Sequence, residues 1–379
     1  MIVKHIFFTL ISFILVSTLS AQTIKSMQWS TIGTLPTPSG MNEQCGLAGA
    51  LIGIHRQNLV IAGGANFPDA PPWQGGTKTY HKHLYQARLK RGMVEWVNIS
   101  TLPAARAYSA NVSTPWGIIC IGGENELGPT DQVWLIKTRP HSPASCTELP
   151  PLPKPLSNTT ATILGNKIYV MGGENQQEVS ASVYYLDWPD RQKGWQIGPS
   201  LPQPVSHALV LADGSTLFLI GGRKRNHGAP SDFYTAVWQL KTDQSSWQSG
   251  PSLPFPLSAH SGVVFNHHLV VISGDQGHTF RQVEQINIDL LTEAHRAQSD
   301  PLNTHKQELL NNHPGFSKTV LLLNIGDQRW HCLDPMTITP PVTTTAVKYQ
   351  GAVVLSNGEI KPGQRTPHIF LGTINDDRP

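Results

Sequence analysis

One short pattern, an apolar run followed by a pair of glycines, recurs along this chain and limits its possible folds more than any other feature. The clear copies are Leu59–Gly64, Ile118–Gly123, Ile168–Gly173 and Leu217–Gly222, and two weaker ones are Leu269–Gly274 and Ala352–Gly358. The last glycines of successive copies are separated by 59, 50, 49, 52 and 84 residues. Self-similarity at such a period indicates an array of similar structural units.

A second pattern, a Trp followed a few residues later by Leu-Pro, runs in phase with the first. Its copies start at Trp29, Trp96, Trp195 and Trp247. Further β-rich runs, such as residues 183–187, lie between each glycine pair and the next Trp. Each unit of about 50 residues therefore holds four short strands, and its order is that of a kelch-type propeller blade. We expect the Gly-Gly strand to be an inner strand of each blade and Leu-Pro to end the outermost one.

The two ends of the chain are complementary. The sixth glycine copy has only one strand candidate after it, residues 366–373, and the first Trp element, residues 28–33, has no Gly-Gly strand before it. The sequence thus predicts an all-β, six-bladed kelch-type β-propeller in one domain, residues 22–379. Its amino-terminal strand would complete the last blade and remove the open edges of the array.

The long step of 84 residues indicates an insertion at about residues 279–316. Apolar residues recur there at helical intervals, namely Ile286, Leu290, Leu291 and Ala294. Residues 304–307 resemble a capping box, and Pro314-Gly315 would end a second helix. We expect a helical hairpin that leaves the fifth blade directly after its inner strand. It is either a surface decoration or a lid over one mouth of the central channel.

Residues 1–21 are predicted to be a signal peptide. Lys4 and His5 precede the apolar run Ile6–Val16, and small residues follow up to Ala21. The alternative, a membrane anchor, needs roughly 20 apolar residues, and this run is shorter. We therefore expect cleavage near Ala21 and a soluble periplasmic protein with no later membrane segment.

Charge and cysteine usage exclude some classes of partner. A formal net charge of +3 is too small to indicate nucleic-acid binding and mildly favours anionic ligands. The four cysteines, Cys45, Cys120, Cys146 and Cys332, lack the spacing of a zinc site, and we expect free buried thiols. No metal or redox cofactor is expected, and the oligomeric state stays open.

Residues directly after the glycine pairs are the first candidates for a site, because propeller loops meet at one mouth of the channel. They begin at Ala65, Glu124, Glu174, Arg223, Asp275 and Glu359. Four of these six positions are acidic and one is basic. We expect carboxylates opposed by arginines at that mouth, unless each residue is only a solvated turn residue.

The most distinctive segment is residues 355–366, which places Glu359, Lys361 and Arg365 around Pro362. Arginine suits a bidentate grip on a substrate carboxylate. A glutamate whose pKa is raised by partial burial suits a general base.

Residues 357–365, Asn-Gly-Glu-Ile-Lys-Pro-Gly-Gln-Arg, closely resemble the active-site loop of the periplasmic N-acetylneuraminate epimerases, the sialic acid mutarotases. The resemblance extends over essentially the whole mature chain, including residues 60–67, 76–80, 106–108 and 120–124. Better-known members carry this loop in mid-chain, with the Gly-Gly-Ala blade after it. The resemblance therefore implies a cyclically permuted branch of the family, which leaves a closed ring unchanged in space.

The resemblance implies an isomerase that interconverts the α and β anomers of sialic acid through the open-chain form by general acid/base catalysis. Glu359 takes the position of the catalytic base and Arg365 that of the group binding the substrate carboxylate. Weaker candidates for ligand contact are Asn66, Lys78, Arg106, Glu124 and His260. A non-catalytic kelch-type propeller that binds a glycan or a protein is the alternative. A copper radical oxidase would need Cys–Tyr and His/Tyr pairs that this sequence does not offer.

Overall fold

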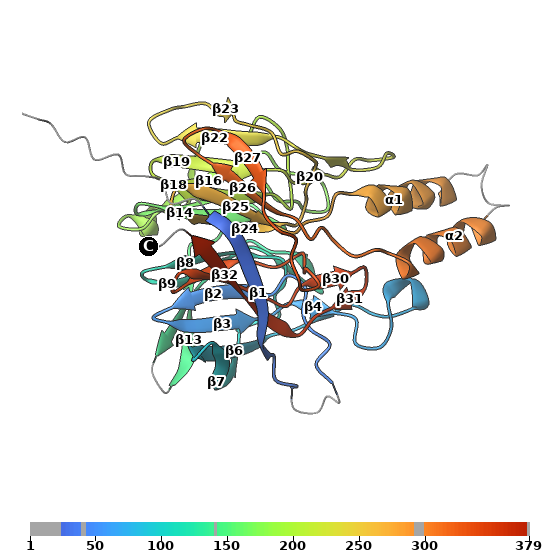
Figure 1. Cartoon of the computed structure of the whole chain (residues 1–379), viewed down its shortest axis with the longest axis horizontal. Helices are drawn as coiled ribbons and strands as arrows, with labels where there is room; N and C mark the ends of the chain where they lie inside the picture. Colours follow the sequence, from blue (N-terminus) through green and yellow to red (C-terminus); the bar gives the residue numbers. More distant parts are fainter. Residues whose placement is uncertain (1–23, 39–42, 140–141, 292–298, 377–379) are drawn as a thin grey trace, which may run out of the picture.

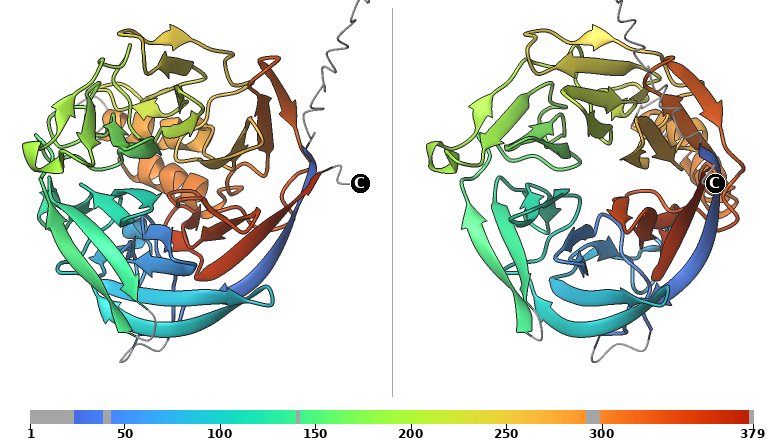
Figure 2. Two further views of the ribbon diagram at one scale, coloured as in Figure 1. Left: turned by 90° about the vertical axis from the view of Figure 1, so that its left-hand side faces the viewer. Right: turned by 60° about the vertical axis from the view of Figure 1, so that its left-hand side comes forward.

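Six four-stranded antiparallel sheets stand around a common axis, which confirms the prediction of an all-β, six-bladed propeller (Figure 2). The computed structural model describes residues 24–38, 43–139, 142–291 and 299–376. The predicted signal peptide, residues 1–21, lies outside the described residues.

The first three blades follow one another along the chain. Blade 1 consists of β2 (Leu51–His55), β3 (Asn58–Ala62), β6 (His83–Lys90) and β7 (Met93–Thr101). Blade 2 consists of β8 (Ala110–Thr114), β9 (Gly117–Ile121), β12 (Val133–Arg139) and β13 (Ser142–Leu149). Blade 3 consists of β14 (Thr160–Leu164), β15 (Lys167–Met171), β16 (Val183–Asp187) and β17 (Gln196–Ile197). The 3₁₀ helix η2 (Arg191–Lys193) precedes β17.

The remaining blades complete the ring. Blade 4 consists of β18 (Leu209–Asp213), β19 (Thr216–Ile220), β22 (Val237–Lys241) and β23 (Gln248–Ser249). Blade 5 consists of β24 (Ser261–Phe265), β25 (His268–Ile272), β26 (Val320–Asn324) and β27 (Arg329–Cys332). Blade 6 consists of β28 (Val347–Tyr349), β29 (Ala352–Ser356), β32 (His368–Asp376) and β1 (Ile24–Thr34).

Blade 6 joins the two ends of the chain, as predicted. The amino-terminal strand β1 pairs antiparallel with β32, from Ile24 opposite Asp376 to Thr34 opposite His368. Ile24, Met27 and Trp29 enter a hydrophobic cluster that also contains residues of blades 5 and 6. The ring is therefore closed by backbone hydrogen bonds and by apolar burial together (Figure 1).

The Gly-Gly strands are the second strands of their blades, which makes them inner strands with a neighbour on both sides. The innermost strands are β2, β8, β14, β18, β24 and β28, which contact each other around the channel. In blade 3 the innermost strand β14 is half-exposed throughout, whereas β15 is buried from Ile168 to Met171. A strand that faces the channel on one side needs fewer apolar residues than a strand covered on both sides. The apolar run in the sequence therefore indicates the second strand of each blade.

Tryptophans in or next to the outer strands form hydrogen bonds between adjacent blades. The indole nitrogens of Trp195, Trp247 and Trp330 donate hydrogen bonds of 2.8–2.9 Å to the carbonyls of Pro150, Pro199 and Pro251, respectively. Each of these prolines lies about 45 to 79 residues earlier, in the segment that leaves the preceding blade. A Trp therefore supplies both apolar area and a directional bond between blades.

Trp247→Phe is expected to lower the free energy of unfolding by about 1–2 kcal/mol, because the bond to Pro199 is lost and its carbonyl is left without that donor. Urea denaturation measures the change. Trp96→Phe is the matched control, since the Trp96 ring packs edge-on against Tyr85 at 5.9 Å and its indole nitrogen donates no hydrogen bond within the described residues. Equal losses in the two variants would contradict a role for the hydrogen bond.

The predicted helical hairpin is present in blade 5, between β25 and β26. It consists of α1 (His278–Leu290) and α2 (Ser299–Asn311) and extends from one face of the ring (Figure 1). The predicted capping box at residues 304–307 was wrong. Thr304 lies inside α2, and its hydroxyl donates to the carbonyl of Asp300, the usual back-bond of a helical threonine. No helix within the described ranges is long and apolar enough to cross a membrane.

All four cysteines are free, but they are not uniformly buried. Cys120 is buried, Cys45 and Cys146 are half-buried, and Cys332 is exposed at the end of the outer strand β27. The expectation of buried thiols was therefore wrong for Cys332. An outer strand buries only the side chains that face its neighbouring blade.

Candidate active site

A closed ring of backbone hydrogen bonds surrounds the propeller axis. One residue from each blade donates its N–H to the carbonyl of the equivalent residue in the preceding blade, at 2.8–3.2 Å. The six residues are Gly49, Tyr108, Asn158, His207, Ala259 and Thr343. All six have positive φ, between 51° and 61°. Five of them are not glycine, and such residues keep this conformation only where the surrounding structure fixes it.

The residues that follow the glycine pairs form a second layer beside this ring. Ala65, Glu124, Glu174, Arg223, Asp275 and Glu359 each form an antiparallel bridge to the residue just before a ring residue. They therefore occupy equivalent places in the six blades. Four of them, Glu124, Arg223, Asp275 and Glu359, line one cavity of about 550 Å³. The predicted convergence of acidic and basic residues at one mouth is thus present in the structure.

The helical insertion supplies one wall of this cavity. Its lining includes Phe280 and Val283 of α1, Lys306 and Leu310 of α2, and His313 and Phe316 beyond α2. Phe280 packs edge-on against Phe233 at 5.7 Å between ring centroids. The cavity therefore has a charged floor on the blades and, on the insertion, a wall that is mainly apolar but includes Lys306 and His313, so that the insertion is more than a surface decoration.

Glu359 and Arg365 face each other in a small hairpin. Strands β30 (Glu359–Lys361) and β31 (Gln364–Arg365) pair with Glu359 opposite Arg365. Arg365 Nη1 lies 3.3 Å from Glu359 Oε1, and the N–H of Gly363 donates to the same oxygen at 2.9 Å. Gly358, with φ of 97°, leaves no room for a Cβ, which would lie 2.5 Å from the carbonyl oxygen of Val342. The close contact between Gly358 and Val342 thus fixes the backbone position from which the Glu359 side chain extends.

Glu359 lines the cavity, whereas Arg365 lies behind it. The Arg365 side chain is only 5 % exposed, and its guanidinium lies over the Phe67 ring at 4.8 Å. Its Nε and Nη1 are buried and donate no hydrogen bond to the described residues. Burial raises the pKa of Glu359, and the Arg365 charge and the Gly363 N–H oppose that rise. The pair presents a carboxylate to the cavity with unused guanidinium donors beside it.

Lys78 and Glu124 form a second charged pair in the cavity. Lys78 Nζ lies 2.9 Å from Glu124 Oε1, to which the Tyr80 hydroxyl also donates at 2.7 Å. The ammonium also lies 4.4 Å from the centroid of the Tyr108 ring. Burial alone would lower the pKa of Lys78, but Tyr108 and Glu124 raise it above its ordinary value. Lys78 therefore stays charged and is a poor proton donor.

Glu174 and Arg223 form the third pair. Arg223 Nη2 lies 3.4 Å from Glu174 Oε1, and Asn158 donates to the same oxygen at 3.1 Å. His207 Nδ1 is 3.6 Å from that oxygen. Burial, aided by the Arg223 charge, lowers the pKa of His207 well below its ordinary value. His207 is therefore a neutral imidazole in the cavity.

Besides Arg365, three of the candidates from the sequence do not line this cavity. Asn66 is buried between the carbonyl of Gly46 and the His81 ring. Arg106 is 1 % exposed, donates to the carbonyl of Gly122 at 2.7 Å and stacks over Trp134. Both side chains satisfy backbone or core groups within the blades, which is a structural role that a sequence pattern does not distinguish from ligand binding.

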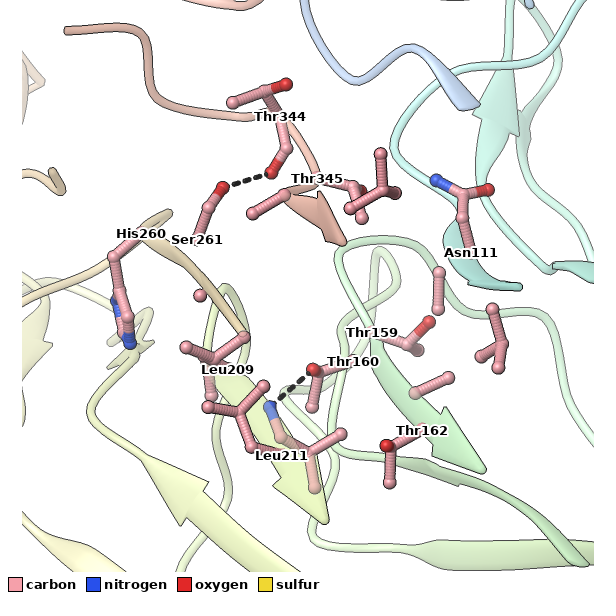
Figure 3. A pocket seen from close by; sticks show the side chains of 18 of the residues that line it. Asn111, Thr159, Thr160, Thr162, Leu209, Leu211, His260, Ser261, Thr344 and Thr345 are labelled. Atoms are coloured by element: carbon pink, nitrogen blue, oxygen red, sulfur yellow. Dashed lines mark hydrogen bonds between the residues drawn. The ribbon is translucent and has the colours of Figure 1, made fainter. Parts of the chain in front are cut away.

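His260 borders a different cavity, of about 430 Å³, on the innermost strands (Figure 3). Its lining includes the hydroxyl groups of Thr159, Thr160 and Ser261 beside many aliphatic side chains, and Ser261 donates to the carbonyl of Thr344. Burial lowers the pKa of His260 to about 4, so that its ring is neutral. The ring residues Tyr108, Asn158, His207, Ala259 and Thr343 line both cavities and therefore lie between them.

Sequence reasoning missed the ring residues, although a signal for most of them exists. Tyr108, Asn158, His207 and Ala259 each stand six residues after the leucine of a Leu-Pro pair or its equivalent. It also missed Trp73, which donates to Asn311 Oδ1 at 2.9 Å and lies against Gly363. No local pattern indicates that contact, because it joins blade 1, α2 and the Glu359 hairpin. No group of three or more metal-ligating side chains occurs among the residues with described positions.

The model of the KLHDC2/KLHL20/DRC7 Kelch-repeats domain matches residues 49–274 of the chain. A solved structure titled "Structure of YjhT" superposes with a TM-score of 0.63, covering 88 % of this chain and 96 % of that chain. Its sequence is only 13 % identical, so this likeness shows the fold alone.

Curated relatives carry the name N-acetylneuraminate epimerase. The protein of Pasteurella multocida (strain Pm70) is 36 % identical over 111 residues, which cover 26 % of this chain and 29 % of the relative. That of Vibrio vulnificus (strain YJ016) is 32 % identical over 118 residues, covering 28 % and 30 %. That of Salmonella enteritidis PT4 (strain P125109) is 26 % identical over 237 residues, covering 61 % and 60 %. The chain thus spans less than a third of the first two relatives and under two thirds of the third. The permuted order of blades stays a prediction.

Proposed function

We propose that this chain, which belongs to the KLHDC2/KLHL20/DRC7 Kelch-repeats domain family, is a sialic acid mutarotase. It would interconvert the α and β anomers of N-acetylneuraminate through the open-chain form. The relatives named N-acetylneuraminate epimerase support the substrate class. The observation that carries the proposal is the ion pair of Glu359 and Arg365 at the edge of one cavity.

The chemistry of the substrate fits this pair. The anomeric carbon of N-acetylneuraminate carries both a carboxylate and the hydroxyl that must lose its proton. A group that binds the carboxylate and a base that takes the proton must therefore stand side by side. Arg365 and Glu359 do so, at 3.3 Å. A carboxylate reaching Arg365 would also supply acceptors to Nε and Nη1, which have none in the described residues.

Glu359 would act as the general base on the anomeric hydroxyl. The carboxylate removes that proton, the bond from the anomeric carbon to the ring oxygen breaks, and the ring oxygen is protonated. Rotation about the bond to the resulting ketone allows closure on its other face, with the proton transfers reversed. Burial raises the pKa of Glu359 towards the range in which a carboxylate is an effective base near neutral pH.

The apolar wall of the insertion would exclude water and contact the uncharged part of the sugar. We further propose that the chain is exported to the periplasm after loss of residues 1–21. A periplasmic mutarotase would act on sialic acid as the sugar enters the cell envelope. The proposed reaction requires no cofactor.

The direct test starts from a single anomer. NMR follows the conversion of α-N-acetylneuraminate, released freshly by a sialidase, with and without the purified protein. Acceleration that scales with protein concentration is expected. Saturable binding with no acceleration would replace this proposal by the alternative of a non-catalytic glycan-binding propeller.

Arg365→Ala is expected to raise KM by about 10- to 100-fold with a smaller fall in kcat, because one charge-assisted contact to the substrate carboxylate is lost. Steady-state anomerisation rates by NMR over a range of sugar concentrations give both constants. Arg225→Ala is the control, since Arg225 binds the backbone carbonyl of Asn175 at the rim of the mouth. An unchanged KM in the Arg365 variant would remove that residue from substrate binding.

A further inference from the structure

Asp275 differs from the other acids of its layer in having no cationic partner. Glu124 pairs with Lys78, Glu174 with Arg223 and Glu359 with Arg365, all within 4 Å. Within the described ranges, no Lys, Arg or His nitrogen lies within that distance of Asp275. Its side chain accepts a hydrogen bond from the N–H of Gly277 at Oδ1, at 2.8 Å.

Asp275 and Glu359 occupy equivalent places in neighbouring blades. Asp275 bridges Ser258 in blade 5, and Glu359 bridges Val342 in blade 6. The next residues, Ala259 and Thr343, are joined by a hydrogen bond of the central ring. Both carboxyl side chains line the same cavity. A pyranose held there would therefore have one carboxyl group from each of two adjacent blades beside it.

We propose that Asp275 is the general acid that protonates the ring oxygen, while Glu359 removes the proton of the anomeric hydroxyl. The inference rests on the proposed function and deepens it by assigning the second proton transfer. In ring opening, Asp275 gives its proton to the ring oxygen as the carbon–oxygen bond breaks. In ring closure, the Asp275 carboxylate takes that proton back, and Glu359 returns its proton to the carbonyl oxygen. No atoms or electrons are gained or lost over the cycle.

The surroundings of Asp275 favour the protonated form. Burial raises its pKa, and the Gly277 N–H and the more distant charges of His313, Arg223 and His278 oppose that rise. His313 has its own pKa lowered by burial and by Lys361, and the charge of Asp275 opposes that fall. Its Nδ1 accepts the N–H of Gly315, so the neutral ring carries its proton on Nε2. Glu359, by contrast, keeps the permanent charge of Arg365 beside it.

Other proton donors in the cavity are less suited. Lys78 is held by Glu124, and its pKa lies above its ordinary value. The pKa of Tyr108 is raised by burial, and that of His207 lies far below neutrality. A general acid works best when its pKa is near the working pH. The raised pKa of Asp275 approaches that range from below.

The test compares Asp275→Asn with the wild-type protein in the NMR anomerisation assay. Asparagine keeps an acceptor oxygen for the Gly277 N–H, so the start of α1 stays supported. We expect kcat to fall by about 100- to 1,000-fold with KM within threefold of the wild-type value. Asp275→Glu should recover part of the rate. Asp232→Asn, which changes an exposed acid in β21 (Asp232–Phe233), is the control and should leave both constants unchanged.

The pH profile separates a catalytic from a structural role. Wild-type kcat/KM should fall as the pH drops through the pKa of Glu359, since the base becomes protonated. It should also fall as the pH rises through the pKa of Asp275, since the acid is lost. The residual activity of Asp275→Asn should keep the acidic fall and lose the alkaline one. Retention of the alkaline fall, or a kcat within threefold of wild type, would overturn the assignment. A wild-type protein without activity would reject the proposed function itself.

Discussion

Glu359→Gln is expected to reduce catalysed anomerisation by at least about 1,000-fold while sialic acid still binds. Glutamine has nearly the same shape and keeps an oxygen for the Gly363 N–H, so the hairpin keeps its geometry. It has no basic oxygen, and general-base catalysis typically contributes 10²- to 10⁴-fold. Exchange between anomers measured by NMR gives the rate, and isothermal titration calorimetry gives the affinity.

Binding in the Glu359 variant should be retained or strengthened. In the wild-type protein, Glu359 is the counter-ion of Arg365 at 3.3 Å, and its removal leaves the guanidinium free for the substrate carboxylate. Glu126→Gln is the matched control, because Glu126 is an exposed acid that follows Glu124 at the same mouth. Glu359→Gln with wild-type turnover would show that another group is the base.

Trp29→Ala is expected to lower the free energy of unfolding by about 3–5 kcal/mol, which is a large part of the stability of an ordinary domain. Trp29 is 8 % exposed and packs where β1 joins β32, with Gly372 directly opposite. Its ring lies so close that a Cβ at Gly372 would stand 2.9 Å from it. The indole nitrogen has no acceptor within the described residues, so the loss is one of packing.

Guanidinium denaturation followed by circular dichroism measures this loss. Leu127→Ala is the control, because Leu127 is 88 % exposed and its truncation should change stability by less than about 0.5 kcal/mol. If the ring is closed by β1, Trp29→Ala should also raise the rate of proteolysis near the amino terminus. A Trp29 variant as stable as the control would mean that β1 contributes little to closure.

The architecture could be predicted because it follows from sequence patterns that are local and that repeat along the chain. An apolar run with two glycines marks the strand that is covered on both faces, and the second glycines adopt φ between 88° and 117° in all six copies. The count of copies and the unmatched strands at the two ends were sufficient to predict closure by β1. The strands closest to the axis carry no such pattern: β14 is half-exposed throughout, whereas β2 is mostly buried.

The candidate site, too, could be predicted from the sequence only in part. The sequence predicted Glu359 and Arg365 as a pair, because they lie six positions apart in one segment whose turn residues are local, and the structure places them opposite each other in a hairpin. It also identified the layer of charged residues after the glycine pairs, since each has the same place in its repeat. It did not distinguish Glu124, which lines the cavity, from Arg106, which is buried beneath Gly122 and over Trp134.

What the chain determined by itself is therefore the type of blade and the number of blades, because these follow from patterns that repeat within short stretches of sequence. Only the tertiary structure decided which charges meet across blades. Lys78 reaches Glu124, and Arg223 reaches Glu174, whereas Asp275, which lines the cavity with Glu359, has no cation within 4 Å among the described residues. Such contacts join residues about 50 or more positions apart. They depend on how neighbouring blades are placed around the axis, and no short sequence pattern specifies that placement.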